Sequence, residues 1–329
     1  MDALLQIRNL SVSFETDEGR LRAVEDVSFD VREGEVLGLV GESGCGKTVT
    51  ALSILRLIPS PPGHIDSGEI LFRGRDLLGL PTEELRRIRG QAISLVFQDP
   101  MTALSPLHRI GHQLVETLQL HQKISRRVAW ALGVEWLAKV GIPAAAERMY
   151  AYPHHLSGGM RQRVMIAMAL MLNPALLIAD EPTTALDVTI QAQIFKLLVE
   201  MKDRSTAILL ITHDMGVVWE MCQRVVVMYA ARMAEEAGAE DLFSRPLHPY
   251  TQGLLRSMPS RQQKGSRLEA IPGQVPSPLR YPAGCRFSDR CPCAFDRCRA
   301  AVPPLYPGGT GRRAACFLLD ADGKEGGCT

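Results

Sequence analysis

Length, composition and charge indicate a folded protein outside the membrane. The chain has 329 residues, of which 46% are hydrophobic and 22% charged, which fits one large domain plus an appendage and excludes a disordered chain. Its longest apolar runs, such as residues 36–40 and 207–211, are far shorter than the ~20 residues that span a bilayer, and the amino terminus lacks a secretory signal. We therefore expect a cytosolic protein. A net charge of +1 gives little attraction for nucleic acid, so we expect no nucleic-acid partner.

The first part of the chain predicts strands, a glycine loop and a helix, in that order. Residues 4–40 contain short β-rich runs broken by Asp, Glu and Gly, which predicts antiparallel strands followed by a buried strand that ends at Val40. From Lys47, apolar side chains recur at helical spacing until Pro59, which predicts a helix directly after the loop.

The glycine loop matches the phosphate-binding pattern G-x-x-x-x-G-K-[ST] between a strand and a helix, the context that gives the pattern its meaning. Its residues are Gly41, Glu42, Ser43, Gly44, Cys45, Gly46, Lys47 and Thr48. Glycines let successive backbone N–H groups face phosphates, Lys47 reaches the β- and γ-phosphates, and Thr48 is suited to bind Mg²⁺. We interpret Cys45 as a small residue tolerated in the loop rather than as a nucleophile.

A helical insertion is expected over about residues 99–163. A second buried strand is predicted at residues 93–97, and amphipathic runs at residues 110–120 and 127–140 follow it. Beyond Pro174 the β/α alternation resumes. Strands are expected at residues 175–180, 207–212 and 224–236, with a helix at residues 188–202. Such alternation implies a parallel sheet covered by helices.

Two of these strands end in chemically useful side chains. Asp180 and Glu181 follow a buried strand, which places them at the sheet edge where ligands bind in α/β folds. Asp180 is suited to hold Mg²⁺ through water, and Glu181 to polarise an attacking water as a general base. His213 follows the strand at residues 207–212, where an imidazole can hydrogen-bond a γ-phosphate.

The segment Leu156-Ser157-Gly158-Gly159-Met160, followed by Arg-Gln-Arg, resembles the signature motif of ABC ATPases. The resemblance covers residues 4–236 and implies an α/β P-loop NTPase fold with a RecA-like core, an antiparallel β subdomain and the helical insertion. In this family the signature faces ATP held by the phosphate loop of a second subunit, so dimerisation completes the active site.

The resemblance also assigns roles to single residues. Phe14 takes the position of the aromatic that stacks on adenine, Gln98 that of the Q-loop, Asp187 that of the D-loop and His213 that of the switch histidine. The implied catalytic residues are Glu181, His213 and Gln98, and the implied Mg²⁺ residues are Thr48, Gln98 and Asp180. The implied contacts to ATP are the phosphate loop with Phe14, Gln98, Ser157, Gly158, Gly159 and Asp187.

The carboxyl-terminal part of the chain forms a separate region. Pro and Gly become frequent after Arg245, so we place the boundary between residues 1–237, a nucleotide-binding domain, and residues 238–329, a loop-rich extension. The runs His-Pro-Tyr-Thr-Gln at 248–252 and 284–316 resemble the extension of dipeptide and oligopeptide importer ATPases.

Four cysteines of the extension predict a metal site. Cys285, Cys291, Cys298 and Cys316 are separated by five, six and seventeen residues, which is not the C-x-x-C pairing of zinc ribbons. Four thiolates from irregular loops fit either Zn²⁺ or a [4Fe–4S] cluster, and the resemblance favours the cluster because related importer ATPases carry one. A structural role is expected. Cys293, two residues from Cys291, is an alternative ligand.

The function implied by the resemblance is ATP hydrolysis that powers import of dipeptides or oligopeptides. The implied partners are a second ABC ATPase subunit, two transmembrane permease subunits and, indirectly, a periplasmic or extracellular peptide-binding protein. The protein would then lie on the cytoplasmic face of a bacterial inner membrane. Import of another solute, such as nickel or a glycoside, and a soluble ABC ATPase without a transport role are the alternatives.

Overall fold

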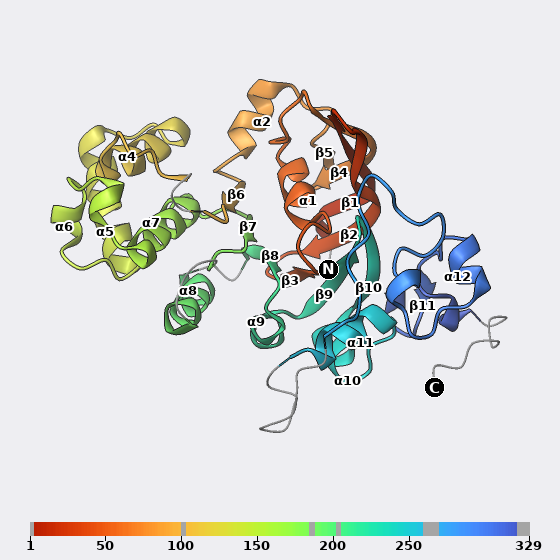
Figure 1. Cartoon of the computed structure of the whole chain (residues 1–329). Helices are drawn as coiled ribbons and strands as arrows, with labels where there is room; N and C mark the ends of the chain where they lie inside the picture. Colours follow the sequence, from red (N-terminus) through yellow and green to blue (C-terminus); the bar gives the residue numbers. More distant parts are fainter. Residues whose placement is uncertain (1–2, 100–102, 184–187, 202–204, 259–269, 321–329) are drawn as a thin grey trace. The chain divides into compact units, whose positions relative to one another are not determined.

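The structure, a computed structural model, describes residues 3–99, 103–183, 188–201, 205–258 and 270–320. Backbone contacts divide the chain into two units. The helical unit contains residues 33–35 and 79–210, and the β-rich unit contains residues 2–32, 36–78 and 211 onward. Figure 1 labels the elements of both units, and each unit is described by itself.

An antiparallel sheet begins the β-rich unit. Its strands, in the order β2-β1-β4-β5, are β2 (Gly19–Arg32), β1 (Ala3–Thr16), β4 (Gly63–Phe72) and β5 (Arg75–Asp76). Along much of β1 and β2, buried side chains alternate with more exposed ones. Such alternation is expected for a sheet with one face packed on the core. The predicted antiparallel strands are confirmed, although β1 and β2 are longer than the runs in the sequence.

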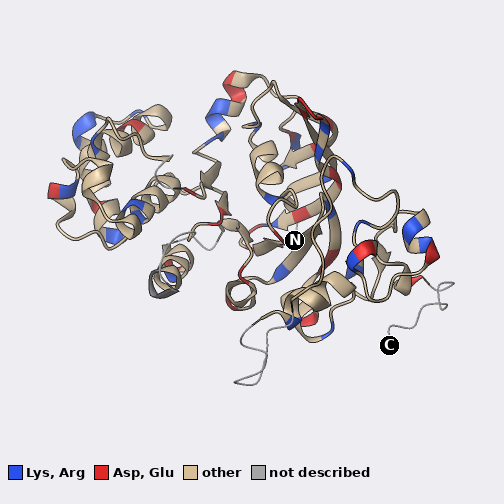
Figure 2. Cartoon of the chain, viewed as in Figure 1, with Lys and Arg blue, Asp and Glu red and all other residues tan. Residues whose placement is uncertain are grey.

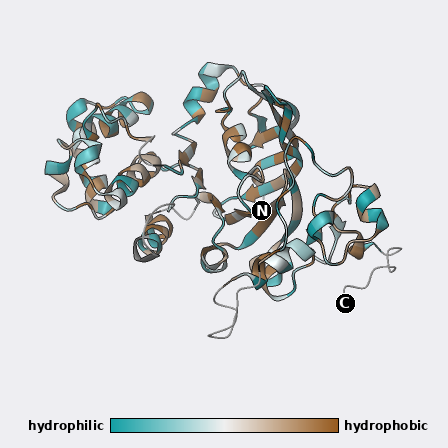
Figure 3. Ribbon diagram, viewed as in Figure 1, coloured by the Kyte–Doolittle hydropathy of each residue, from teal (hydrophilic) through white to brown (hydrophobic). Residues whose placement is uncertain are grey.

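A second sheet of this unit contains the strand that leads into the phosphate loop. Its order is β3 (Val36–Val40), β9 (Arg224–Tyr229), β10 (Arg232–Gly238), β12 (Arg313–Ala314) and β11 (Tyr306–Pro307). Strand β3 runs parallel to β9, and the other pairs are antiparallel. Every residue of β3 and β9 is buried, as expected for apolar strands in the middle of a sheet, and Figure 3 shows their hydropathy.

The run at residues 224–236, expected as one element, is a hairpin. The chain turns at Ala230 and Ala231, which have φ angles of 45° and 70°. A two-residue turn in the left-handed region normally uses Asn or Gly, so nothing in the sequence marked it. Both alanines are fully buried, and contacts with other segments hold them in this conformation.

Short helices complete the β-rich unit. They are α1 (Lys47–Ile54), α9 (Met215–Met221), α10 (Ala239–Ser244), α11 (Pro249–Arg256), α12 (Asp296–Ala300) and the 3₁₀ turns η3 (Ser288–Arg290) and η4 (Phe317–Leu319). Helix α1 is shorter than predicted, because Arg56 already has a left-handed φ of 49° before the prolines that follow.

The helical unit combines three adjacent strands with the helical insertion. Its strand order is β8 (Ala207–Thr212, of which the last two residues belong to the β-rich unit), β7 (Leu176–Asp180) and β6 (Ile93–Val96). Its helices are α2 (Thr82–Ile88), α4 (Ile110–His121), α5 (Arg126–Lys139), α6 (Ala145–Arg148), the 3₁₀ turn η1 (Pro153–His155), α7 (Gly158–Leu170) and α8 (Val188–Met201). The helices predicted at residues 110–120, 127–140 and 188–202 and the predicted parallel pairing within the sheet are confirmed, whereas α2 and α6 were not predicted. Charges of both signs occur on single short helices, as α2 and α12 show in Figure 2.

The extension is joined to the second sheet of the β-rich unit through strand β12. Arg313 of β12 donates from Nε to Glu236 of β10 at 2.7 Å, and Glu236 also pairs with Arg224 at 2.8 Å. Glu235, which is fully buried, accepts hydrogen bonds from the backbone N–H groups of Leu247 and His248 at 2.8 and 2.9 Å. The chain after residue 238 is therefore tied to β10 by backbone pairing and by buried charge.

His248 gives this region a testable pH dependence. Its Nδ1 accepts from Tyr250 N–H at 3.0 Å, and burial lowers the pKa of His248 to about 4. The pKa of histidine in the unfolded chain is about 6.5, so between those values only the unfolded chain binds the proton, and the free energy of unfolding falls as the pH falls. At pH 5 the loss from this residue is about 2 kcal/mol relative to pH 7.

The measurement is urea denaturation of the wild type and of His248→Asn at pH 7 and pH 5. Asparagine keeps an acceptor for the Tyr250 N–H group but does not titrate, so the variant should lose about 2 kcal/mol less than the wild type over this interval. An identical pH dependence in the two proteins would contradict the role given to His248.

Candidate nucleotide-binding site

The phosphate loop connects β3 to α1 and lies against the backbone of two other strands. Gly41 and Gly46 have φ angles of 150° and 103°. A Cβ atom on Gly41 would lie 2.2 Å from the carbonyl oxygen of Met228, and one on Gly46 would lie 2.3 Å from that of Ala23. Only glycine fits at these two positions, so both the turn and the close approach of the backbone require it.

Lys47 is held over this loop by the loop's own carbonyl groups. Its Nζ donates to the carbonyl oxygens of Gly41 at 2.8 Å and Glu42 at 3.0 Å, and its side chain is buried. Burial raises the pKa of the Cys45 thiol despite the attraction of the nearby Lys47 charge. Cys45 is thus a protonated buried thiol, in agreement with its interpretation as a small loop residue rather than a nucleophile.

The amino terminus of α1 offers backbone donors in the same loop. Gly46 is the N-cap residue. Because glycine has no side chain, it cannot cap the backbone N–H groups of the first helical turn. The partial positive charge of a helix amino terminus favours anions, and phosphate is a common ligand there. Thr48 lies exposed in this first turn, and its role as an Mg²⁺ ligand stays a prediction.

Phe14, the predicted adenine contact, lies on β1 of the same unit. It is half-buried and pairs with Gly63 of β4. A Cβ atom on Gly63 would lie 2.9 Å from Cε1 of Phe14, so the ring packs on the glycine backbone and keeps part of its surface exposed. Stacking on adenine remains a prediction.

The helical unit brings two predicted catalytic residues together. Gln98 follows β6 and Glu181 follows β7, and these strands are adjacent and parallel. Nε2 of Gln98 donates to Oε2 of Glu181 at 3.2 Å. Glu181 has a left-handed φ of 43°, a conformation that is costly for a non-glycine residue and that occurs often at functional sites. Asp180, one residue earlier, is buried at the end of β7.

The predicted signature segment begins helix α7. The Ser157 side chain is the N-cap and accepts from Met160 N–H at 3.3 Å. Gly158 and Gly159 form the start of the helix, and Ser157 and Gly158 are exposed. Farther along α7, the buried side chain of Gln162 donates to the carbonyl oxygen of Pro182. The signature helix is therefore tied to the loop that follows Glu181.

The remaining predicted residues are placed less completely. His213 follows β8 in the β-rich unit and is exposed, and Asp214 beside it caps α9 through hydrogen bonds to Gly216 and Val217. Asp187 lies outside the described residues. The phosphate loop and His213 belong to one unit, whereas Gln98, Asp180, Glu181 and the signature belong to the other.

Sequence reasoning missed two residues that contact the phosphate loop. The Tyr250 hydroxyl accepts from the backbone N–H of Glu42 at 2.9 Å, and Arg290 forms two hydrogen bonds with the Glu42 carboxylate, at 2.7 and 3.0 Å. Both residues come from the extension, more than 200 positions later in the chain. Both residues lie within the two runs that resemble the importer extension, at 248–252 and 284–316, and nothing else in the sequence marks them.

The four extension cysteines lie near one another as reduced thiols. Burial raises the pKa of Cys285 to about 11 and that of Cys316 to about 12, and the charges of neighbouring cysteines of the group add to both shifts. Among the described residues, however, no three His, Cys, Asp or Glu side chains are spaced to hold a metal ion. Cys293 lies outside this set of reduced thiols.

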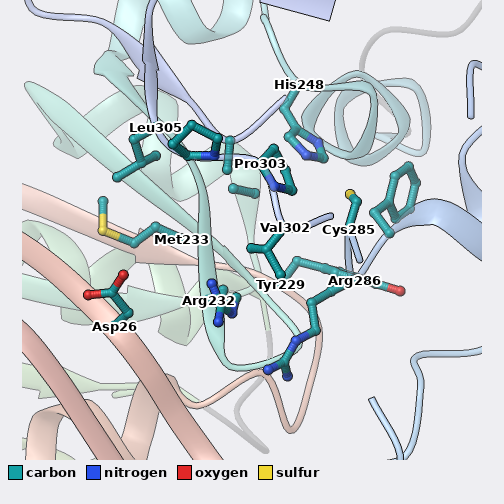
Figure 4. A pocket seen from close by; sticks show the side chains of 14 residues that line it. Asp26, Tyr229, Arg232, Met233, His248, Cys285, Arg286, Val302, Pro303 and Leu305 are labelled. Carbon is teal, nitrogen blue, oxygen red and sulfur yellow. The ribbon is translucent and has the colours of Figure 1, made fainter. Parts of the chain in front are cut away.

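One thiol of the group reaches a cavity of about 330 Å³. Figure 4 shows Cys285 and Arg286 on its wall together with His248 and a group of apolar side chains that includes Val302 and Leu305. Of the grouped cysteines, Cys285 therefore lines a cavity of the β-rich unit.

Comparison with known proteins places both parts of the chain. The ABC transporter family matches residues 24–184, and the family described as oligopeptide/dipeptide transporter, C-terminal region, matches residues 234–298. Among the described residues, no helix is long and apolar enough to cross a membrane.

Curated relatives match over almost the full length. The chain is 54% identical over 319 residues to a probable peptide ABC transporter ATP-binding protein, y4tR, of Sinorhizobium fredii, covering 96% of this chain and 95% of the relative. It is 50% identical to the oligopeptide transport ATP-binding protein OppD of Escherichia coli, covering 96% of this chain and 93% of that protein.

Solved structures confirm the expected fold. A dimeric ATP-binding cassette in a post-hydrolysis state, bound to ADP and Pi, is similar with a TM-score of 0.64 and 26% identity, over 71% of this chain and 98% of that chain. A structure of cbiO1 from Clostridium perfringens, part of an ABC transporter complex, has a TM-score of 0.61 and 27% identity, over 74% of this chain and 92% of the other. The predicted fold class and family resemblance are thus confirmed.

The glycine geometry predicts which loop substitutions affect nucleotide binding. Gly46→Ala must move the loop, because the new Cβ would collide with the carbonyl oxygen of Ala23 at 2.3 Å. We expect its affinity for MgATP to fall by at least about tenfold, since a small displacement of a binding loop has a large effect.

Gly44→Ala is the matched control. Gly44 also has a positive φ, 77°, but a Cβ there would meet nothing within 4 Å, so this variant carries only the left-handed strain of about 1–2 kcal/mol. Calorimetric titration of both variants with MgATP makes the comparison. An equal loss of affinity in both would contradict the collision as the cause.

Proposed function

We propose, because this chain belongs to the ABC transporter family of ATP-binding proteins, that it is the ATP-hydrolysing subunit of an importer of dipeptides or oligopeptides. The observation that carries the substrate class is the match of residues 234–298 to the oligopeptide/dipeptide transporter C-terminal region. Relatives named for peptide or oligopeptide transport share about half of all residues with this chain, across both regions.

The chemistry proposed for the site follows from its parts. Backbone N–H groups of the phosphate loop and Lys47 bind the β- and γ-phosphates. Thr48, Asp180 and Gln98 are the residues that would hold Mg²⁺, which neutralises phosphate charge when bound. Glu181 takes a proton from the attacking water. The hydrogen bond from the Gln98 amide, 3.2 Å long, orients the carboxylate of Glu181 for that task.

The remaining residues act at the γ-phosphate and across a dimer. His213 donates a hydrogen bond to the γ-phosphate of bound ATP. The exposed start of α7, with Ser157, Gly158 and Gly159, supplies donors to the nucleotide on a second ATPase subunit. ATP binding then holds two subunits together, and hydrolysis lets them separate.

Partners in the membrane are proposed from the surface of the helical unit. Leu107 and Leu120 are 82% and 73% exposed, and a hollow of about 380 Å³ beside Leu120 is lined by α4 and by Arg126. Exposed apolar side chains beside a hollow favour contact with another protein. We assign this surface to the transmembrane permease subunits, and we propose that the chain lies on the cytoplasmic face of the inner membrane. A peptide-binding protein on the other side of that membrane would deliver the substrate.

The role of Glu181 predicts a separation of binding from hydrolysis. Glu181→Gln keeps the shape of the side chain and leaves the phosphate loop and Asp180 unchanged, but an amide cannot take a proton from water. In the assembled transporter we expect ATP turnover to fall by at least about 100-fold, with MgATP affinity within about twofold of the wild type.

Phosphate release at saturating MgATP measures the first quantity, and titration with MgATP measures the second. Glu135→Gln is the control, because Glu135 is an exposed carboxylate of α5 that forms an ion pair with Lys139 at 2.6 Å. Wild-type turnover in the Glu181→Gln complex would show that this residue is not the base.

A [4Fe–4S] cluster is proposed for the cysteine group. The donor set fits, since Cys285, Cys291, Cys298 and Cys316 supply four thiols whose charges affect one another, two of them buried and two partly exposed. Their present spacing does not enclose a metal ion, so binding requires the thiols to move closer. The bound group would hold together a loop-rich region with little apolar core, which is a structural role.

Metal analysis of protein purified without oxygen tests this proposal. We expect about four iron and four sulfide per chain, with a brown colour, and loss of both in Cys298→Ser. Cys222→Ala, at a buried cysteine outside the group, should keep the full content. Zinc in place of iron, or protein without metal, would contradict the cluster.

A further inference from the structure

Glu42, the second residue of the phosphate loop, is held by the extension at both its backbone and its side chain. The two terminal nitrogens of Arg290 bind the two carboxylate oxygens of Glu42, at 2.7 and 3.0 Å. The Tyr250 hydroxyl accepts from the Glu42 backbone N–H at 2.9 Å. All three residues belong to the β-rich unit.

Arg290 is fixed on its other sides as well. Its Nε donates to the carbonyl oxygen of Pro272 at 2.9 Å, and its Nη1 also donates to the Tyr229 hydroxyl at 3.2 Å. The ring of Tyr229 packs on that of Tyr250 with centroids 4.6 Å apart. The guanidinium is therefore presented to Glu42 in one orientation, which is the geometry in which a two-point arginine–carboxylate pair is strong.

A second arginine of the same extension segment reaches the loop through one intermediate. Arg286 donates to the carbonyl oxygen of Ala230 at 2.9 Å, and its guanidinium lies 3.6 Å from the centre of the Tyr281 ring. The next residue, Ala231, donates its N–H to the carbonyl oxygen of Cys45 at 3.1 Å. The β9–β10 turn thus connects Arg286 with the phosphate loop.

The Glu42–Arg290 pair differs from an ordinary surface ion pair. Exposed pairs contribute little to stability, but the side chain of Arg290 is only 5% exposed and that of Glu42 28%. The location also matters. A carboxylate in a loop that binds a triphosphate would repel the ligand unless a positive charge neutralised it and held it aside.

We propose that Arg290 and Tyr250 are positioning residues for ATP, because they hold the Glu42 carboxylate and backbone in the conformation that leaves the phosphate loop open to phosphates. Arg286 supports the same loop through the Ala230–Ala231 turn. This inference rests on the proposed binding of ATP at the loop. It makes Tyr250, Arg286 and Arg290 of the extension part of the support of the nucleotide site.

The test compares four variants of the full chain by titration with MgATP. Arg290→Met leaves the Glu42 charge without its partner and should weaken MgATP binding about tenfold. Arg290→Lys keeps a positive charge and should recover part of the affinity. Glu42→Gln removes the repelling charge, so the double variant Arg290→Met with Glu42→Gln should bind MgATP better than Arg290→Met alone.

Arg297→Met is the matched control. Arg297 belongs to the same extension, pairs with Asp320 at 2.9 Å and lies 4.3 Å from the centre of the Phe317 ring, away from the phosphate loop. It should leave MgATP affinity unchanged. Thermal unfolding by circular dichroism shows which variants are folded at the titration temperature, and Arg290→Lys carries the test if Arg290→Met is not.

A kinetic readout separates positioning from general stability. In the assembled transporter, Arg290→Met should raise the KM for ATP about tenfold while kcat at saturating ATP stays within about twofold, because Gln98 and Glu181 are unchanged. Folded Arg290→Met with wild-type affinity, or equal losses in Arg290→Met and Arg297→Met, would overturn the inference. Failure of the wild type to bind MgATP, or binding by Lys47→Ala as tight as wild type, would instead overturn the proposed site.

Discussion

Close packing of the phosphate loop backbone against two strands is the constraint on which the rest of the site depends. Gly41 lies against the carbonyl of Met228 on β9, and Gly46 against that of Ala23 on β2. A phosphate loop binds its ligand mainly through backbone N–H groups, so its conformation has to be fixed before the ligand arrives. The contacts with β9 and β2 restrict the loop conformation on the side that packs against these strands. Lys47 restricts it further through hydrogen bonds to two carbonyl groups of the loop. The extension then holds the remaining free flank at Glu42.

Local sequence signals predicted the parts of this arrangement that are local in the chain. The phosphate loop, the strands before it, the buried strands at residues 93–97, 175–180 and 207–212, and the two long helices of the insertion follow from hydrophobic period and turn residues, whereas β4 and β5 were not predicted. The hairpin at Ala230 and Ala231 does not, because its left-handed residues are alanines and its conformation depends on Cys45 and Arg286, far away in the chain. Gln98 and Glu181 were each predicted as catalytic residues, but nothing in the sequence predicted the hydrogen bond between them. The Glu42–Arg290 pair joins residues 248 positions apart, and no pattern in a single sequence marks such a pair.

The extension is integrated with the nucleotide-binding part through the same physical means that hold a domain together. Strand β12 pairs with β10, and Arg313 and Arg224 share the buried carboxylate of Glu236. Burial raises the pKa of Glu235, although two backbone N–H groups of the extension bind its carboxylate. Removing the extension would take both backbone partners from Glu235 and would leave Glu236 with Arg224 alone, and a buried carboxylate that loses its partners is strongly destabilising. The boundary near residue 238, placed from the rise in Pro and Gly content, remains a prediction.

The arginines that support the phosphate loop are neighbours of the grouped thiols in the chain. Arg286 follows Cys285, and Arg290 precedes Cys291. The short segment between these cysteines contains the 3₁₀ turn η3, whose backbone bonds join Cys285 to Ser288 and Phe287 to Arg290. A covalent or coordinate link that fixes both ends of a segment this short also fixes the residues within it, since few backbone torsions remain free. A group that held Cys285 and Cys291 in place would therefore also restrain Arg286 and Arg290 between them. It would keep Arg286 against the β9–β10 turn and Arg290 against the phosphate loop. This explains physically how a small region with little apolar core contributes to a nucleotide site that it does not itself contain.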